Sequence, residues 1–413
     1  MTMSTFLFFA CLYHHISSLP EPIQLPSKVL FYQDIFYASL GTRNPPEHRF
    51  SPPGASFFRN NQEKSTPLFY KCSNIGIIRN ENCLSLNAYV PAMNFNRSVQ
   101  LKPIIILHWL NSFSSFSNQN FDQVHQLGQK LTLHLDVITI ILSHRLGLPG
   151  FLSLRGSPMS GNYAIFDFHA AIIWVINNGY RFHGNSSNMI FMGVDKGATL
   201  MHIYSLTDLA KRITTNVKKI ILLGSNKFKV GLPSEFQADR VKQTLYNFLK
   251  KAINISEELD AYKMELELVK MENKSERLAT KEKQILCREL KSMKIQQLIQ
   301  LEASFIEKAR ANSEAFAPNR EEIFGNKSLS ELTLDTASLF SQADILIGNE
   351  YPPVTSYRNK TMRDLLFGFF SKNVSIFSEA AAIMFYCKSC CSQQNKKSFG
   401  TTLSAAVSCP SSS

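Results

Sequence analysis

Long apolar runs, basic tracts and metal-ligand patterns are all missing from this 413-residue chain. No run of about 18 apolar residues occurs, so we predict no transmembrane segment. The net charge is +12, but the basic residues form no tract interleaved with aromatics, so we expect no nucleic-acid partner. The cluster of Cys387, Cys390 and Cys391 lacks a second ligand pair at zinc-site spacing, so we expect no metal and no cofactor.

What is present is the composition of a globular chain, with 44% hydrophobic and 18% charged residues. Short β-rich apolar runs alternate with stretches of helical spacing, which favours an α/β fold with buried strands. The predicted strands are 83–91, 103–107, 136–142, 189–192, 219–223 and 344–347, and the predicted helices include 120–133 and 164–176. We expect the second of these helices to end at a glycine cap, Gly179.

Three stretches depart from this alternation. Residues 20–60 are proline-rich, and because proline cannot serve a central strand, we expect an extended covering segment. Residues 235–311 are rich in Lys and Glu with apolar positions at helical spacing, which predicts a helical subdomain. Two interpretations of this subdomain remain: a coiled-coil arm and ordinary surface helices. Residues 367–413 show no further strand–helix unit, and from Lys388 onward they are rich in Ser, Lys and Gln, which is typical of an irregular tail.

Residues 1–19 allow two interpretations. The apolar run 6–13, with small residues near Ser18, is typical of a signal peptide, but the usual positively charged start is missing. An N-terminal core strand or a wrongly assigned start of the chain is the alternative. A signal peptide would make the protein secreted or extracellular and open its N-x-S/T sequons to glycosylation. The seven sequons are at Asn96, Asn185, Asn254, Asn273, Asn326, Asn359 and Asn373.

A strand–turn–helix frame surrounds Asp195. The apolar run 189–192 precedes Gly193-Val194-Asp195-Lys196-Gly197, and helical spacing follows. This is the frame of the G-x-S-x-G nucleophile elbow. Both glycines are present, as a sharp turn requires, but aspartate stands where the serine nucleophile belongs.

Further motifs occur in a fixed order along the chain. They are Tyr37-Ala38 with Pro45-Pro46 and Arg49-Phe50-Ser51-Pro52-Pro53, then Glu81-Asn82-Cys83-Leu84-Ser85-Leu86-Asn87, then Ser143-His144-Arg145-Leu146-Gly147, then Gly161-Asn162-Tyr163 with Asp167. With the elbow, they resemble the type-B carboxylesterase/cholinesterase family of α/β-hydrolases. The resemblance implies an α/β-hydrolase domain over residues 20–366. Such a domain has a mostly parallel central sheet flanked by helices, here with a helical insert and a shortened C-terminal part.

The resemblance also implies structural pairs. Arg49 is expected to pair with Glu81, and Arg145 with Asp167, as buried ion pairs. Removing one partner of such a pair costs about 3–5 kcal/mol. A disulfide between Cys72 and Cys83 is implied as well. Two buried thiols are the alternative for these cysteines.

The catalytic parts implied by the family are degenerate. The oxyanion loop, glycine-rich in the family, is His108-Trp109-Leu110-Asn111, and bulky side chains there hinder the approach of backbone N–H donors. The family spacing of the acid falls on Pro353, which leaves Glu350 a poor candidate. The catalytic histidine should follow the acid in the chain, yet no histidine follows His202.

Two hypotheses address Asp195. Some α/β-hydrolases use an elbow aspartate as nucleophile, but their ester intermediate needs a histidine to activate water. The alternative is that the carboxylate caps the helix that follows. We therefore expect a catalytically inactive protein similar to the neuroligin-like members of the family, with a protein partner at the cell surface. The alternative is a carboxylic-ester hydrolase represented by a truncated or degenerate chain.

Overall fold

A mixed sheet of eight strands forms the centre of the described chain, in the order β1-β2-β3-β5-β4-β6-β7-β8. The strands are β1 (Ile23–Leu25), β2 (Val29–Phe36), β3 (Ser85–Pro91), β4 (Lys102–Leu110), β5 (Ile138–Leu142), β6 (Gly184–Asp195), β7 (Val217–Leu223) and β8 (Asp344–Gly348). Strands β1, β2, β3 and β5 pair antiparallel, whereas β5, β4, β6, β7 and β8 pair parallel. The sheet is therefore mostly parallel, as predicted.

The computed structural model describes most of the chain before residue 349. The described residues are 19–26, 28–43, 45–54, 81, 83–92, 100–115, 121–154, 157–223, 239–268, 273–309, 316–319, 323–324, 335 and 337–348. The chain divides into two units, residues 1–354 and 355–413, and all described residues belong to the first.

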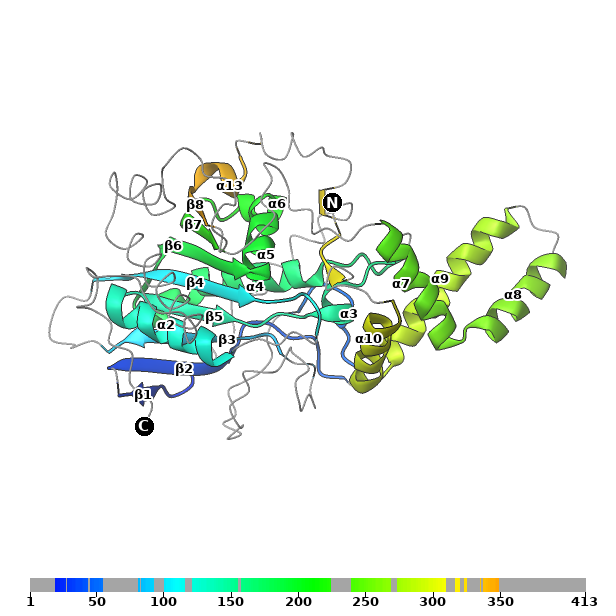
Figure 1. The fold of residues 1–413 in the computed structure, drawn as a ribbon, viewed down its shortest axis with the longest axis horizontal. Coiled ribbons are helices and arrows are strands. Elements are labelled where there is room, and N and C mark those ends of the chain that lie inside the picture. The colour runs from blue at the N-terminus through cyan, green and yellow to red at the C-terminus, as the bar shows by residue number, and fades with distance from the viewer. Residues whose placement is uncertain are drawn as a thin grey trace, which may run out of the picture. The chain divides into compact units, whose positions relative to one another are not determined.

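Helices connect and cover the strands (Figure 1). They are α2 (Phe121–Leu135), α3 (Gly147–Phe151), α4 (Tyr163–Asn178), the 3-10 helix η2 (Gly179–Phe182), α5 (Lys196–Ser205), α6 (Asp208–Lys211), α7 (Asp239–Ile253), α8 (Ser256–Leu268), α9 (Lys274–Ser292), α10 (Ile295–Ala309) and α13 (Leu339–Gln342). None of the helices within the described ranges is long and apolar enough to cross a membrane.

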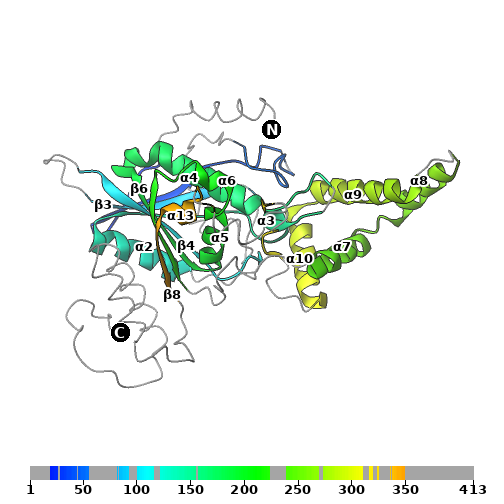
Figure 2. The ribbon, with the colours of Figure 1, turned by 90° about the horizontal axis from the view of Figure 1, so that it is seen from above.

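Both faces of the sheet are buried, because successive side chains of a strand point to opposite faces. On one face, Ile106 and Phe191 join the large core cluster, and Phe191 packs against Phe168 of α4. On the other face, Tyr89 belongs to a smaller cluster that Ile141 packs against, under helix α2. Figure 2 shows α2 and α4 on opposite sides of the sheet. Burial on both faces explains the continuous apolar runs in the sequence.

Helices α7 to α10 occupy the stretch for which a helical subdomain is expected. Their apolar residues, including Leu249, Leu286 and Phe305, belong to the same large core cluster as the sheet. Helices α8 and α9 contact each other and run outward side by side (Figures 1 and 2). Arg288 on α9 forms a salt bridge with Glu258 on α8. The segment from α7 to α10 therefore packs on the core at one end, and much of α8 is exposed to solvent.

One expectation from the sequence is wrong. The proline-rich segment is not only an extended cover, since β1 and β2 form an antiparallel ribbon within it. Helix α4 does end at Gly179, which occupies the C-cap position as predicted, but Gly179 has a helical backbone (φ −57°) and the chain continues into η2. The left-handed residue that ends this segment is His183 (φ 59°). Asparagine, aspartate and histidine adopt this conformation more readily than most other non-glycine residues.

Several predicted features lie outside the described residues. They are residues 1–18, Cys72, Asn96, Asn326, Glu350, Pro353, Asn359, Asn373, the cluster Cys387, Cys390 and Cys391, and the tail 367–413.

Candidate functional site at the elbow

The elbow forms where β6 ends at Asp195 and α5 begins at Lys196. Asp195 has φ 55° and ψ −124°, a sparsely populated conformation that costs on the order of 1–3 kcal/mol for a residue with a side chain. A strained residue at the strand-to-helix turn is the geometry in which an elbow exposes its nucleophile. The turn of a nucleophile elbow is therefore present, with a carboxylate in place of a hydroxyl.

Two glycines make this turn sterically feasible. A Cβ on Gly193 would lie 2.5 Å from the Cα of Ala198, and a Cβ on Gly197 would lie 2.0 Å from the carbonyl oxygen of His108. Both contacts are with backbone atoms, which cannot move aside cheaply. The glycines at these two positions are thus required by the close approach of α5 to β6 and β4.

The side chain of Asp195 does not cap helix α5. Asp195 occupies the N-cap position, but its side chain makes no capping hydrogen bond, so the capping hypothesis is wrong. A capping residue needs an extended backbone to turn its oxygen toward the first N–H groups of the helix, and φ 55° places Asp195 outside that region. Its Oδ2 instead accepts a hydrogen bond from the indole Nε1 of Trp109 at 3.1 Å.

The degenerate oxyanion residues are largely part of the sheet. His108, Trp109 and Leu110 continue β4 and pair in register with Gly193, Val194 and Asp195 of β6. Asn111 follows directly and is exposed. An oxyanion hole needs backbone N–H groups turned toward the substrate. Here a paired strand ending in Trp109 and Leu110 occupies the place of a glycine-rich loop.

A histidine pair lies buried beneath the elbow. The Nε2 atoms of His108 and His144 are 3.1 Å apart, and His144 Nδ1 lies 2.8 Å from the carbonyl oxygen of Arg145. That carbonyl can only accept, so His144 carries its proton on Nδ1 and accepts at Nε2 from His108. Burial, and secondarily His144, holds the pKa of His108 well below its usual value. Burial also lowers the pKa of His144, so both rings are neutral and bonded to each other.

Three further histidines are neutral, of which His169 and His202 are buried and His125 is half-buried. His202 lies on α5, His169 on α4 near the Tyr204 hydroxyl (2.8 Å), and His125 on α2 beside the Tyr89 hydroxyl. Burial lowers the pKa of each of the three to about 4. A buried ring in a packed helix face is a structural element, and none of these three rings is part of the elbow turn.

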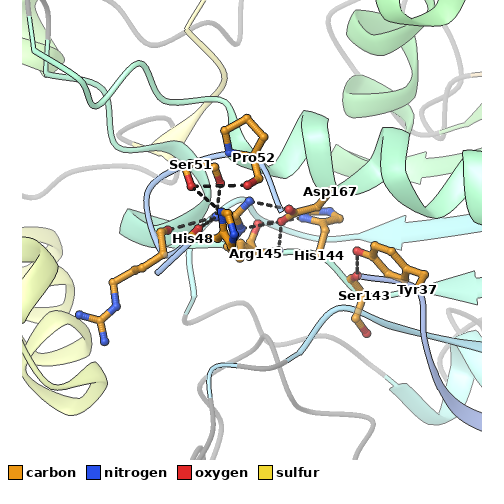
Figure 3. A network of polar contacts seen from close by, with 9 residues as sticks. Tyr37, His48, Ser51, Pro52, Ser143, His144, Arg145 and Asp167 are labelled. Carbon is orange, nitrogen blue, oxygen red and sulfur yellow. Dashed lines mark hydrogen bonds and ion pairs between the residues drawn. The ribbon is translucent and has the colours of Figure 1, made fainter. Parts of the chain in front are cut away.

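Arg145 and Asp167 form a fully buried ion pair near the elbow strand. Arg145 donates from Nε and the backbone N–H to Asp167 Oδ2, and from Nη2 to Oδ1 at 2.5 Å. Its Nη1 donates to the carbonyl oxygens of His48, Arg49 and Ser51. Figure 3 shows Arg145 at the centre of this network. The pair fastens the segment around residue 50 to α4 and to the chain after β5.

Arg49 likewise links separate segments of the chain, and it does so at the end of α9. It pairs with Glu81, and its Nη1 donates to the carbonyl oxygens of Leu290, Lys291 and Met293. The last carbonyls of a helix have no partner within the helix and carry partial negative charge. Arg49 therefore binds the carboxyl end of α9, which attaches the helical segment to the N-terminal part of the chain.

Sequence analysis missed one buried carboxylate, that of Glu302 on α10. Its Oε1 accepts hydrogen bonds from Ser114 Oγ (2.9 Å) and the Ser115 N–H (2.7 Å), and its Oε2 accepts from Ser115 Oγ (2.9 Å) and the Leu148 N–H (3.1 Å). Burial raises the pKa of Glu302, and these four donors oppose the rise. A Cβ at Gly147 (φ 59°) would lie 1.9 Å from its Oε2. One carboxylate thus links α10 to α3 and to the segment after β4.

One feature of the sequence indicates that Glu302 is buried. It lies four residues after Leu298 and three before Phe305, both of which are buried, so a charge stands on the apolar face of a predicted helix. A buried carboxylate must find hydrogen-bond donors. The identity of those donors is not readable from α10 itself.

The other residues singled out from the sequence are not part of the elbow. Cys83 is buried, while its expected partner Cys72 lies outside the described residues. Asn254 and Asn273 are exposed, and Asn185 is half-buried. Within the described ranges, no group of three or more His, Cys, Asp or Glu side chains could hold a metal ion.

The mostly parallel sheet, with its elbow between β6 and α5, defines an α/β-hydrolase. Solved esterases share this fold. A thermophilic PNB esterase matches with a TM-score of 0.54 at 16% identity, covering 88% of this chain and 71% of its own. A Geobacillus stearothermophilus carboxylesterase matches with a TM-score of 0.54 at 18% identity, covering 79% and 59%. The model of the carboxylesterase family matches residues 41–380, so the chain belongs to this family.

Curated relatives match over a shorter segment. A Bos taurus carboxylesterase 4A is 32% identical over 131 residues, which cover 32% of this chain and 22% of the relative. A Bungarus fasciatus acetylcholinesterase is 32% identical over 134 residues, covering 32% and 21%. A Bombus ignitus carboxylic ester hydrolase is 29% identical over 130 residues, covering 32% and 22%. The chain is thus matched to about a fifth of the length of these relatives.

Proposed function

We propose that this chain is a catalytically inactive member of the carboxylesterase family that binds a protein partner outside the cell. The observation that carries the proposal is the state of the elbow. Its strained turn is intact, but the side chain at its apex is the carboxylate of Asp195, which accepts a hydrogen bond from Trp109. Both residues stand at positions where an esterase has catalytic groups.

Ester hydrolysis through this elbow lacks support at each chemical step. Attack by a carboxylate on an ester gives an anhydride, whose hydrolysis needs a base to activate water. The neutral His108 and His144 are buried and bonded to each other, and His202 is buried in α5. Stabilisation of the developing oxyanion, which is worth about 10²–10³ in rate per donor, would have to come from the paired strand at Trp109 and Leu110.

A hydrolysis assay tests the proposal that the protein is catalytically inactive. The purified full chain is incubated with p-nitrophenyl acetate and, separately, with a fluorophosphonate probe. We expect no labelling, and the same background rate for the wild-type protein and Asp195→Ala. Asp195→Ser is the sharper variant. It restores a hydroxyl to the intact turn, and we expect it to remain unlabelled because a serine without a base stays protonated. Turnover that Asp195→Ala abolishes would refute inactivity.

A binding assay tests the proposal that the protein binds a partner outside the cell. Fluorescent full-length protein is titrated onto neuronal and epithelial cells, with excess unlabelled protein as competitor. We expect saturable binding that the competitor removes and that Asp195→Ala leaves unchanged, since an adhesion surface does not use the elbow carboxylate. The absence of saturable binding on every cell type would contradict the partner hypothesis.

The second candidate is an ester hydrolase represented by a truncated or degenerate chain. It is favoured by the names of the relatives, which are esterases, and by the limited share of them that this chain matches. The genomic sequence downstream of the last codon distinguishes the two. An in-frame G-x-x-H segment there would show that the chain is truncated and would support the second candidate.

A further inference from the structure

Two of the sequons have exposed asparagines and lie in the chain just before helix α8 and at the start of helix α9. Asn254-Ile255-Ser256 joins α7 to α8, and Asn273-Lys274-Ser275 begins α9 after α8. We propose that Asn254 and Asn273 carry N-linked glycans and that Asn185, the third sequon of the described residues, does not. The proposal rests on the extracellular location in the proposed function.

The first acceptor, Asn254, already has its sequon folded into a compact turn. It is exposed, with φ 51°, a left-handed conformation that asparagine tolerates better than most residues. Ser256 Oγ lies 2.8 Å from the amide oxygen Oδ1 of Asn254. The hydroxyl and the amide of this sequon therefore lie side by side. The contact uses the amide oxygen and not the nitrogen that would receive the sugar.

The second acceptor, Asn273, has a side chain that the fold does not use as a cap. It occupies the N-cap position of α9, where asparagine ordinarily accepts a hydrogen bond from the first turn. At φ 57° its side chain makes no such bond, and the first turn is served by its backbone carbonyl, which accepts from the N–H groups of Glu276 and Arg277. Asn273 and Ser275 are both exposed, so a glycan here disturbs no helix cap.

The sequon at Asn185 differs in each of these respects. Asn185 is half-buried on β6 and pairs with Pro103 of β4. Its Oδ1 accepts a hydrogen bond from the Ser187 N–H at 3.0 Å, and the intervening Ser186 carbonyl accepts from Asn216 Nδ2 at 3.0 Å. The sequon is tied into an irregular stretch of strand, where a bulky hydrophilic glycan would displace sheet contacts.

The transfer is chemically balanced with a lipid-linked oligosaccharide diphosphate as donor. The amide Nδ2 of Asn254 or Asn273 forms a bond to the anomeric carbon of the first sugar, and the bond from that carbon to the diphosphate oxygen breaks. The amide nitrogen loses one proton, and the lipid diphosphate leaves. No oxidant or reductant takes part.

Glycans at these positions would stand at the start of α8 and at the start of α9. This helix runs outward with α9 in both views (Figures 1 and 2) and exposes Met264, whose relative exposure is 67%. Glycosylation would add solubility to this exposed apolar side chain and would restrict access to α8. The partner surface of the proposed function would then lie on another part of the molecule.

Site mapping in secretory cells tests the proposal. The full chain is expressed with its own N-terminus and, in parallel, with an unrelated cleavable leader ahead of it. N-glycans are removed enzymatically in ¹⁸O water, and each former acceptor is identified by peptide mass spectrometry. We expect Asn254 and Asn273 to be occupied and Asn185 to be unoccupied. The sequons outside the described residues are read as separate peptides.

Matched variants sharpen the result. Ser256→Ala should lose the glycan of Asn254 while keeping the asparagine, Asn273→Gln should lose the other, and Ser187→Ala should change nothing. Occupancy of Asn185, or of neither Asn254 nor Asn273 in the form with the leader, would overturn the assignment. Occupancy of the two acceptors only in the form with the leader supports the assignment and contradicts the extracellular location.

Discussion

Mild acid should destabilise this protein because its buried histidines are neutral. The pKa of each of His125, His169 and His202 is lowered by burial from 6.5 to about 4. A base whose pKa is depressed in the folded state contributes stability above its unfolded pKa, and that stability is lost as the pH falls toward the folded pKa. The loss therefore begins near pH 6.5 and continues to about pH 4.

The magnitude follows from linkage. Between pH 7.5 and pH 5, a histidine with pKa 6.5 unfolded and about 4 folded loses about 2 kcal/mol of stability. The three together lose about 6 kcal/mol, a large part of the roughly 5–15 kcal/mol that stabilises a typical protein. The lowered pKa values of His108 and His144 act in the same direction. The raised pKa of Glu302 acts in the opposite direction, because its folded form binds a proton more tightly.

Urea unfolding at pH 7.5 and pH 5, followed by circular dichroism, measures the effect. We expect the free energy of unfolding of the wild-type protein to fall by about 6 kcal/mol between pH 7.5 and pH 5. His169→Asn keeps a polar atom near the Tyr204 hydroxyl without a titrating ring, so the fall should be smaller by about 2 kcal/mol. The control is His134→Asn, since His134 is exposed at the end of α2. Equal falls in the His169→Asn and wild-type proteins would refute the reasoning.

The core strands were predictable because burial on both faces leaves a strong pattern. The stretches 103–107 and 219–223 lie within β4 and β7, and their continuous apolar runs correspond to strands covered by helices on both sides. Strand β2 was missed for a physical reason. Its register shifts between Tyr32 and Ile35, where Asp34 has φ 55° and donates its N–H to Asn87. A bulge of this kind breaks the period of two on which strand prediction depends.

The elbow divides into predictable and unpredictable parts. The positions of Gly193 and Gly197 followed from a fixed local spacing, because a tight turn is set by a few adjacent residues. The partner of Asp195 was not predictable from local sequence, since Trp109 lies 86 residues away and reaches it only through the pairing of β4 with β6. The predicted helix cap failed because the strained backbone of Asp195 turns its carboxylate elsewhere.

Two substitutions with matched controls test the packing described above. Asp167→Asn should lower the free energy of unfolding by about 3–5 kcal/mol, because it strands the buried charge of Arg145. In contrast, Asp136→Asn, which removes an exposed salt-bridge partner, should change it by no more than about 1 kcal/mol. Gly197→Ala should abolish cooperative thermal unfolding or lower its midpoint markedly, because the added Cβ would lie 2.0 Å from a backbone carbonyl oxygen. Gly128→Ala in α2 adds a Cβ that meets side-chain atoms at 3.0 Å or more and gains helix propensity of up to about 1 kcal/mol, so its midpoint should stay within a few degrees. If Gly197→Ala were as stable as Gly128→Ala, α5 would have to sit farther from β4 than the elbow geometry places it.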